Sequence, residues 1–143
     1  MSLRLEDQLC FSLYAASRAI TAAYAPLLAP LGLTYPQYLV MLVLWERDGA
    51  TVKQIGEALA LDSGTLTPLL KRLEAQRLVR RERSTADERV VHIQLTAEGK
   101  KLKARARSVP EKLVACMGGQ IQEVVALRQR LDALTRTVRE RPC

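Results

Sequence analysis

One segment, residues 51–95, restricts the fold more than any other part of the chain, because the spacing of its apolar residues changes partway through. Thr51-Val-Lys-Gln54 matches the capping pattern that starts a helix. A turn follows at Asp62-Ser63-Gly64, where Asp62 or Ser63 can cap a second helix that runs to about Gln76. Residues of one face recur at helical spacing, namely Ile55, Ala58 and Leu59 in the first helix and Leu66, Leu69, Leu70 and Leu73 in the second. The segment therefore predicts two consecutive helices whose apolar faces pack into a core.

Beyond Gln76 the pattern becomes alternating, which is typical of strands. Residues 78–83 and 89–95 are strand-like, and Ser84-Thr-Ala-Asp87 between them has the composition of a turn. The predicted β-hairpin carries basic residues at its tip: Arg80, Arg81, Arg83 and Arg89. Asp87 precedes Arg89 by two residues, so its carboxylate can orient that guanidinium through a bidentate pair.

The outer face of the second helix and the tip of the hairpin share a composition that suits DNA. A helix in the major groove needs slim, polar and cationic side chains. A basic ribbon beside it can contact phosphates or place an arginine in the minor groove. The candidate DNA-binding residues are Ser63, Thr65, Thr67, Pro68, Lys71, Arg72, Arg83, Asp87 and Arg89. The alternative is a helical hairpin whose charged face is merely solvated.

Five motifs of this region resemble those of the MarR family of winged-helix repressors, and the segment that they span, residues 54–99, is about a third of the chain. They are Gln54-Ile-Gly-Glu-Ala-Leu59, Leu69-Leu-Lys-Arg-Leu-Glu74, Leu78-Val-Arg-Arg81, Asp87-Glu-Arg-Val-Val91 and Leu95-Thr-Ala-Glu-Gly99. The resemblance implies a mainly α fold with a small β-hairpin wing, a winged helix-turn-helix that binds double-stranded DNA as a homodimer.

Composition sets wider limits. The chain has 143 residues, a net charge of +7 and a pI of about 9.7, so we expect one domain with an anionic partner. No apolar run reaches the roughly 18 residues of a membrane span, and the start lacks the apolar run of a signal peptide. The basic residues are dispersed rather than gathered on one amphipathic face, which argues against a membrane surface. We therefore expect a cytoplasmic protein that keeps its three cysteines as thiols.

The remaining residues predict helices on both sides of the winged core. A first helix is expected from about Asp7 to Leu28, ended by Pro26, Pro30 and Gly32, and a second at about 36–47. Thr96 can cap a long helix that is interrupted at Pro110 or at Gly118-Gly119, and a last helix is expected at about 120–140. We expect a single domain, 1–143, with a winged helix-turn-helix core at about 34–95 and dimerisation helices at about 1–33 and 97–143. The apolar faces of the first and last helices predict pairing with a second copy and hence a palindromic operator.

Cys10 is the candidate sensor residue. If Asp7 caps the first helix, Cys10 lies in its first turn, where free N–H groups favour the thiolate that a peroxide oxidises. Glu6 and Asp7 act in the opposite direction, and an inert cysteine is the alternative. Tyr14 lies one helical turn after Cys10, and the phenols of Tyr24 and Tyr35 are suitable donors to a thiolate. Tyrosines in apolar surroundings can equally be core residues with a satisfied hydroxyl.

The N-terminal third resembles a narrower group, the organic hydroperoxide resistance repressors. The resemblance rests on Leu5-Glu-Asp-Gln-Leu-Cys-Phe-Ser-Leu-Tyr-Ala-Ala-Ser-Arg18, Tyr24 and Leu33-Thr-Tyr-Pro-Gln-Tyr38. It implies that an organic hydroperoxide oxidises Cys10, that Tyr24 and Tyr35 bond its thiolate, and that Tyr14 supports them. It also implies repression of a gene for a thiol-dependent organic hydroperoxide reductase. One branch of the group resolves the oxidised sensor with a second cysteine, for which we favour Cys116; the other branch uses a small thiol. Cys143 is expected to be frayed and incidental.

Two other functions fit parts of the sequence. One is a repressor of the same fold that a small aromatic ligand releases from DNA, which would still respond after Cys10→Ser. The other is a thiol peroxidase with Cys10 as catalyst, although no docking site for a reductant is visible. We predict no enzymatic activity, no cofactor and no metal site, because no metal-ligand cluster, phosphate-binding glycine loop or Ser/His/Asp set occurs. His92, on a predicted strand, is interpreted as structural.

Overall fold

The structure is a computed structural model that describes residues 2–118 and 120–141. The chain forms two compact units, residues 1–107 and 108–143. Cys143, which was expected to be frayed and incidental, lies outside the described residues.

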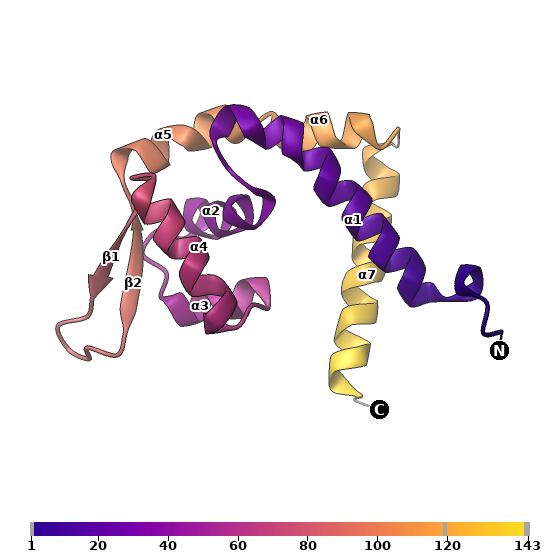
Figure 1. The fold of residues 1–143 in the computed structure, drawn as a ribbon, viewed down its shortest axis with the longest axis horizontal. Helices are drawn as coiled ribbons and strands as arrows, with labels where there is room; N and C mark the ends of the chain where they lie inside the picture. Colours follow the sequence, from indigo (N-terminus) through magenta and orange to yellow (C-terminus); the bar gives the residue numbers. More distant parts are fainter. Residues whose placement is uncertain (1, 119, 142–143) are drawn as a thin grey trace. The chain divides into compact units, whose positions relative to one another are not determined.

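The first unit contains a helical body and a β-hairpin (Figure 1). Its elements are a short 3-10 helix Leu5–Asp7, α1 Leu9–Leu28, a second 3-10 helix Ala29–Leu31, α2 Tyr35–Glu46, α3 Val52–Leu59, α4 Ser63–Ala75, β1 Val79–Arg83, β2 Val91–Leu95 and α5 Ala97–Ala106. The helix-turn-helix and hairpin expected from the sequence are therefore confirmed.

Helix starts follow the capping residues that the sequence contains. Thr51 and Gln54 form a reciprocal capping box at α3, and Thr34 and Gln37 form another at α2. Asp62, rather than Ser63, caps α4 by accepting a hydrogen bond from the Thr65 N–H at 2.8 Å. These side chains satisfy amide groups that a helix start leaves without a partner.

The core of the first unit consists of apolar side chains from α2, α4 and the hairpin. The predicted leucine face of α4 is buried, as are Val40, Met41 and Leu44 of α2. The expectation for Ala58 was wrong, because this residue is exposed, and Leu42 of α2 is 41% exposed as well. Both point away from the packed side because α2 and α3 each cover the core with one face only.

The hairpin is antiparallel, with Val79 opposite Leu95 and Arg83 opposite Val91. The second edge of β2 is also occupied, because Ile93 exchanges hydrogen bonds with Gly49 and Ala50 at 3.1 and 2.9 Å. β2 is thus fixed between β1 and the segment that precedes α3, which places the hairpin beside the helix-turn-helix.

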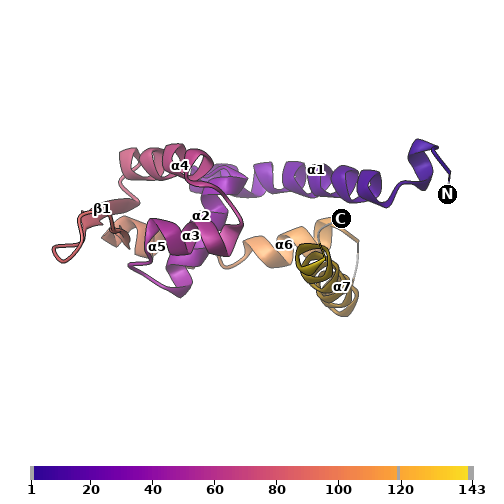
Figure 2. The ribbon, with the colours of Figure 1, turned by 90° about the horizontal axis from the view of Figure 1, so that it is seen from below.

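Helix α1 differs from the prediction at both ends. Gln8 is its N-cap and makes no side-chain cap, whereas Asp7 belongs to the preceding 3-10 helix. Pro26 lies inside α1, which continues to Leu28. Pro26 removes one hydrogen bond from the last turns of the helix without ending it, and the break comes later, at Gly32 with its φ of +67°. Figure 2 shows α1 extending beyond the other helices of this unit, which leaves most of its side chains exposed.

The second unit contains α6 Val109–Cys116 and α7 Ile121–Glu140. The break before α6 falls at Arg107 and Ser108, and Pro110 occupies the first turn of α6 instead of breaking a helix. The described part of α7 has no buried residue, and its apolar side chains are open: Ile121, Val125, Leu127, Leu131, Leu134 and Val138.

Within the described residues no single helix has both the length and the apolar composition needed to cross a membrane. Residues Leu9–Leu31 together with Tyr35–Glu46 meet that criterion as a pair bent by 68°, but α2 supplies buried core residues of this unit.

Candidate DNA-binding surface and cysteine site

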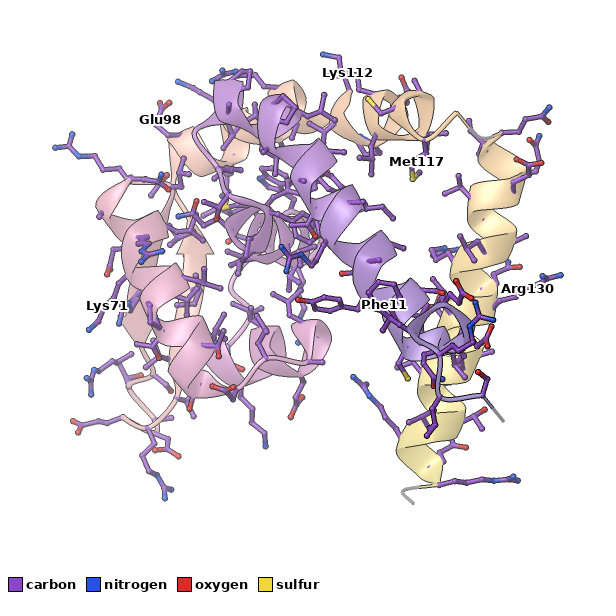
Figure 3. All side chains as sticks on the ribbon, turned by 45° about the vertical axis from the view of Figure 1, so that its right-hand side comes forward. Phe11, Lys71, Glu98, Lys112, Met117 and Arg130 are labelled. Carbon is purple, nitrogen blue, oxygen red and sulfur yellow. The ribbon has the colours of Figure 1, made fainter. Side chains whose placement is uncertain are left out.

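The outer face of α4 presents the polar side chains selected from the sequence. Ser63, Thr65, Pro68, Lys71 and Arg72 are exposed, whereas Thr67 is half-buried. Lys71 points away from the helical body (Figure 3). The buried leucines hold this helix in place while the opposite face remains open to a ligand.

The hydroxyl of Thr65 already makes a hydrogen bond within the protein. Thr65 donates from its side chain to Asp62 at 3.1 Å, in addition to the N–H bond that caps α4. These hydrogen bonds, the backbone one first, hold the pKa of Asp62 below its usual range. Thr65 is therefore a structural part of the helix start as well as an exposed residue.

The loop between the strands holds an arginine in a fixed orientation. Arg89 donates from Nε to Asp87 Oδ1 at 3.2 Å and from its terminal nitrogen to Oδ2 at 3.3 Å, and its N–H also bonds Asp87. The side-chain contact, followed by the backbone contact, lowers the pKa of Asp87. The bidentate pair expected from the sequence is confirmed, and it presents a largely exposed guanidinium at the hairpin tip.

Arg81 was placed wrongly in the basic tip. Its side chain is only 30% exposed and pairs with Glu74 of α4, with Nε 3.2 Å from Oε2. Strand alternation explains the difference, because Arg81 lies on the opposite face of β1 from Arg80 and Glu82.

A groove of about 430 Å³ lies between α3, α4 and the hairpin. Thr67, Arg81 and Arg89 line it, together with Lys53 and Val52 of α3. Lys53 was not among the candidates from the sequence. The capping box at Thr51 was the available signal, because it fixes Lys53 in the first turn of α3.

The two described cysteines are free and exposed. Cys10 is the second residue of α1, so its expected position in the first turn is confirmed although Asp7 is not the cap. Cys116 is the last residue of α6, followed by Gly118 in a left-handed conformation. The two thiols belong to different units.

Tyr24 and Tyr35 lie together, with ring centroids 4.6 Å apart, and Tyr38 is 5.7 Å from Tyr24. Burial, followed by the charges that Tyr35 and Tyr38 would carry, raises the pKa of Tyr24 to about 12. Burial likewise raises the pKa of Tyr35. Both phenols therefore keep their protons at neutral pH and can donate hydrogen bonds. Tyr38 was missed as a member of this cluster, although helical spacing from Tyr35 places it on the same face.

Tyr14 stands apart from this cluster on the exposed face of α1. Its hydroxyl accepts a hydrogen bond from Arg18 at 2.8 Å, and the guanidinium carbon lies 5.4 Å from the ring centroid. Because the oxygen accepts from Arg18, its own hydrogen remains available to another acceptor. Among the described residues no cluster of His, Cys, Asp and Glu is arranged to hold a metal ion.

Comparisons with known proteins agree with this architecture. The model of the transcriptional regulator SarA/Rot family matches residues 22–106. The organic hydroperoxide resistance transcriptional regulator of Bacillus subtilis is 48% identical over 139 residues, covering 97% of this chain and 95% of the relative.

Two solved structures of AbfR, a Staphylococcus epidermidis protein, are also similar. Reduced AbfR bound to DNA gives a TM-score of 0.83 at 39% identity, covering 96% of this chain and 94% of AbfR. Disulfide-formed AbfR gives 0.66 at 42% identity, covering 93% of each chain. The curated relatives are named as transcriptional regulators, not enzymes. This chain therefore belongs to the MarR family of winged-helix transcriptional regulators, in the group that contains the organic hydroperoxide resistance regulators.

Proposed function

We propose that this transcriptional regulator is a homodimeric repressor that binds a palindromic operator and releases it when an organic hydroperoxide oxidises Cys10. The observation that carries the proposal is the exposed Cys10 in the first turn of α1, a helix whose far end holds the phenol of Tyr24 against that of Tyr35 at the start of α2. The similarity to an organic hydroperoxide resistance regulator supports it.

DNA binding is assigned to α4 and the hairpin. Its candidate residues are Ser63, Thr65, Thr67, Pro68, Lys71, Arg72, Arg83, Asp87 and Arg89, with Lys53 added from the groove. Slim residues and hydroxyls on α4 suit the major groove, and the Asp87-held Arg89 suits a phosphate or the minor groove. The similarity to a DNA-bound regulator supports this assignment.

Dimerisation is assigned to the terminal helices α1 and α7. Both carry apolar side chains that remain open in the chain, among them Leu9 at 61% exposure and Val138 at 61%. A two-fold dimer brings two recognition helices to major-groove faces about 34 Å apart, which requires a palindromic operator.

The chemistry transfers two electrons from one thiolate. Cys10 Sγ attacks the terminal peroxide oxygen, the O–O bond breaks, and the alkoxide leaves as an alcohol after taking a proton. Cys10 is then a sulfenic acid. The thiolate of Cys116, proposed to come from the partner subunit, attacks that sulfur and expels hydroxide, which leaves as water, to give a disulfide. The Cα atoms must approach within about 7 Å, so helix movement is expected to shift the wings out of register.

The test is operator binding by reduced protein titrated with cumene hydroperoxide. Wild type, Cys10→Ser and Cys116→Ser are compared, and non-reducing gels follow crosslinking. Wild type is expected to lose at least tenfold in affinity, about 1.4 kcal/mol, as a crosslinked dimer forms. Cys10→Ser is expected to bind DNA and to show neither change.

Each remaining outcome identifies a different fault in the proposal. Release by Cys10→Ser at the wild-type peroxide dose overturns peroxide sensing and favours a small aromatic ligand as inducer. Release by Cys116→Ser without a crosslink replaces Cys116 by a small thiol. Repeated turnover of peroxide with a thiol reductant, rather than one oxidation per subunit, favours a peroxidase.

A further inference from the structure

We infer that Glu74 is a positioning residue that fixes the wing against the recognition helix α4. The inference rests on the proposed DNA binding, because α4 and the hairpin must meet one duplex together. Glu74 lies in the last turn of α4, and its two carboxylate oxygens both contact Arg81 of β1. Oε1 accepts a hydrogen bond from the Arg81 N–H at 3.3 Å, and Oε2 lies 3.2 Å from Arg81 Nε.

Strand pairing explains why the Arg81 N–H is free for this contact. Arg81 lies opposite Ile93, whose own N–H and carbonyl group bond Ala50 and Gly49 on the other side of β2. In an antiparallel ladder such a pair exchanges no hydrogen bonds, so the Arg81 N–H faces away from β2. Glu74 is the acceptor that the described residues provide at this outer edge.

The side chain of Arg81 depends on the same carboxylate. Its Nε is buried and makes no hydrogen bond of good angular geometry within the described residues, so its contact with Glu74 is an ion pair. Removing Glu74 leaves this partly buried cation without its counter-charge, which costs more than loss of an exposed pair.

The linker between α4 and β1 closes onto the end of the helix, since the Leu78 N–H donates to the Leu73 carbonyl oxygen at 3.0 Å. It is three residues long, 76–78, and contains Arg77 with a φ of +59°. Glu74 adds a second connection beyond this bend, from the helix to the middle of β1. We expect it to set where Arg89 at the hairpin tip lies relative to Lys71 on α4.

The sign of the DNA-binding effect separates positioning from charge. Removing a carboxylate from a DNA-binding face reduces repulsion of phosphates and, on charge alone, strengthens binding. If Glu74 acts by holding Arg81, its removal instead weakens DNA binding. Glu82 is the matched control, because it is the next residue of β1, is exposed and faces the other side.

The experiment uses a duplex that full-length wild type selects from a random-sequence library. Glu74→Ala is expected to weaken binding by about tenfold, whereas Glu82→Ala binds as tightly as wild type or more tightly. Arg89→Gln is then made in wild type and in the Glu74→Ala protein. Arg89→Gln is expected to reduce affinity by a smaller factor in the Glu74→Ala protein than in wild type, because a wing that is not held contributes less to DNA binding.

A folding effect is separated by thermal unfolding and by a second variant. Glu74→Gln keeps an acceptor for the Arg81 N–H but loses the charge, so it is expected to fall between wild type and Glu74→Ala. Binding by Glu74→Ala equal to that of Glu82→Ala, or an unchanged fold-loss for Arg89→Gln, overturns the positioning role.

Hydrogen exchange of backbone amides tests the contact between Glu74 and Arg81 in the absence of DNA. The Arg81 amide is expected to exchange slowly in wild type and rapidly in Glu74→Ala, while the Arg80 amide, which faces β2 opposite Gln94, is unchanged. If wild type selects no duplex, the proposed function fails, and the exchange measurement still decides whether Glu74 holds β1. Equal exchange of the Arg81 amide in wild type and Glu74→Ala overturns the inference that Glu74 holds β1.

Discussion

Gly99 and Leu78 approach so closely that a side chain on Gly99 has no room: a Cβ there would overlap the Leu78 carbonyl oxygen and lie 3.1 Å from its carbon. The neighbour is backbone at the base of β1, which cannot turn aside as a flexible side chain can. The start of α5 is therefore packed directly on the junction between α4 and the wing.

Replacing Gly99 by alanine is expected to destabilise the protein by about 2 kcal/mol or more, because the packed backbone must shift. At a solvent-exposed position inside a helix, glycine to alanine stabilises by roughly 0.5–1 kcal/mol, so the sign of the stability change distinguishes a packed site from an exposed one. Urea unfolding measures it. The control is Ala97→Gly in the same helix, at an exposed position, and a stable Gly99→Ala protein would contradict the packing argument.

Arg77 adopts a φ of +59° at the end of α4. A left-handed conformation costs a residue with a Cβ roughly 1–2 kcal/mol, so Arg77→Gly is expected to stabilise by about 0.5–1 kcal/mol after the greater chain entropy of glycine is subtracted. The midpoint of urea unfolding reports the gain. Arg77→Ala keeps the strain and should show no comparable gain; equal stabilisation by both would point to the arginine side chain instead.

Tyr24 should dominate the alkaline behaviour of the first unit. Its folded pKa is about 12 against an ordinary value of 10.0, so the folded state holds the proton more tightly than the unfolded chain. This contribution to stability is complete below pH 10 and is lost as pH rises from 10 towards 12. Unfolding free energy measured across this window should fall less in Tyr24→Phe than in wild type. Early appearance of tyrosinate absorbance, with one ionisation missing in Tyr24→Phe, would oppose the assignment.

Asp48 is expected to contribute to the acid sensitivity of the wing. Burial acts to raise the pKa of its carboxyl, but hydrogen bonds from the Leu95 N–H and Lys100 outweigh it and the pKa lies below 3.8. The stability it supplies is present above pH 3.8 and is lost as pH falls through the folded pKa. Asp48→Asn should therefore be less stable at neutral pH and lose less on acidification. Parallel unfolding curves for the two proteins at all pH values would exclude this role.

Lys71 and Arg89 should affect DNA binding differently from a lysine elsewhere. Neutralising one phosphate-contacting cation reduces the slope of log affinity against log salt by about 1. Lys71→Gln and Arg89→Gln are each expected to show this change, measured by fluorescence anisotropy at several salt concentrations. Lys112→Gln in α6 is the comparison, and an identical slope in all three variants would remove both residues from the interface.

The sequence by itself determined the order and type of the elements around the DNA-binding segment. Caps such as Thr51–Gln54 and Thr96, and the leucine spacing of α4, act within one helical turn, so they can be recognised without the fold. The Asp87–Arg89 pair was predictable for the same reason, since its members are only two positions apart in the sequence. The first-turn position of Cys10 followed from local sequence, although the cap was misassigned to Asp7.

The tertiary structure alone decided contacts between residues far apart in the chain. Ile93 bonds Gly49 and Ala50 across the sheet, and the Trp45 indole donates to the Gly99 carbonyl at 2.9 Å. The pairing of Arg81 with α4 instead of its exposure at the wing tip was also decided by the tertiary structure, because which face of β1 meets α4 depends on how the linker turns. Local patterns specify helices, strands and turns, but which faces meet is set by the packing of the whole core, where burial of the α2 and α4 side chains selects one arrangement.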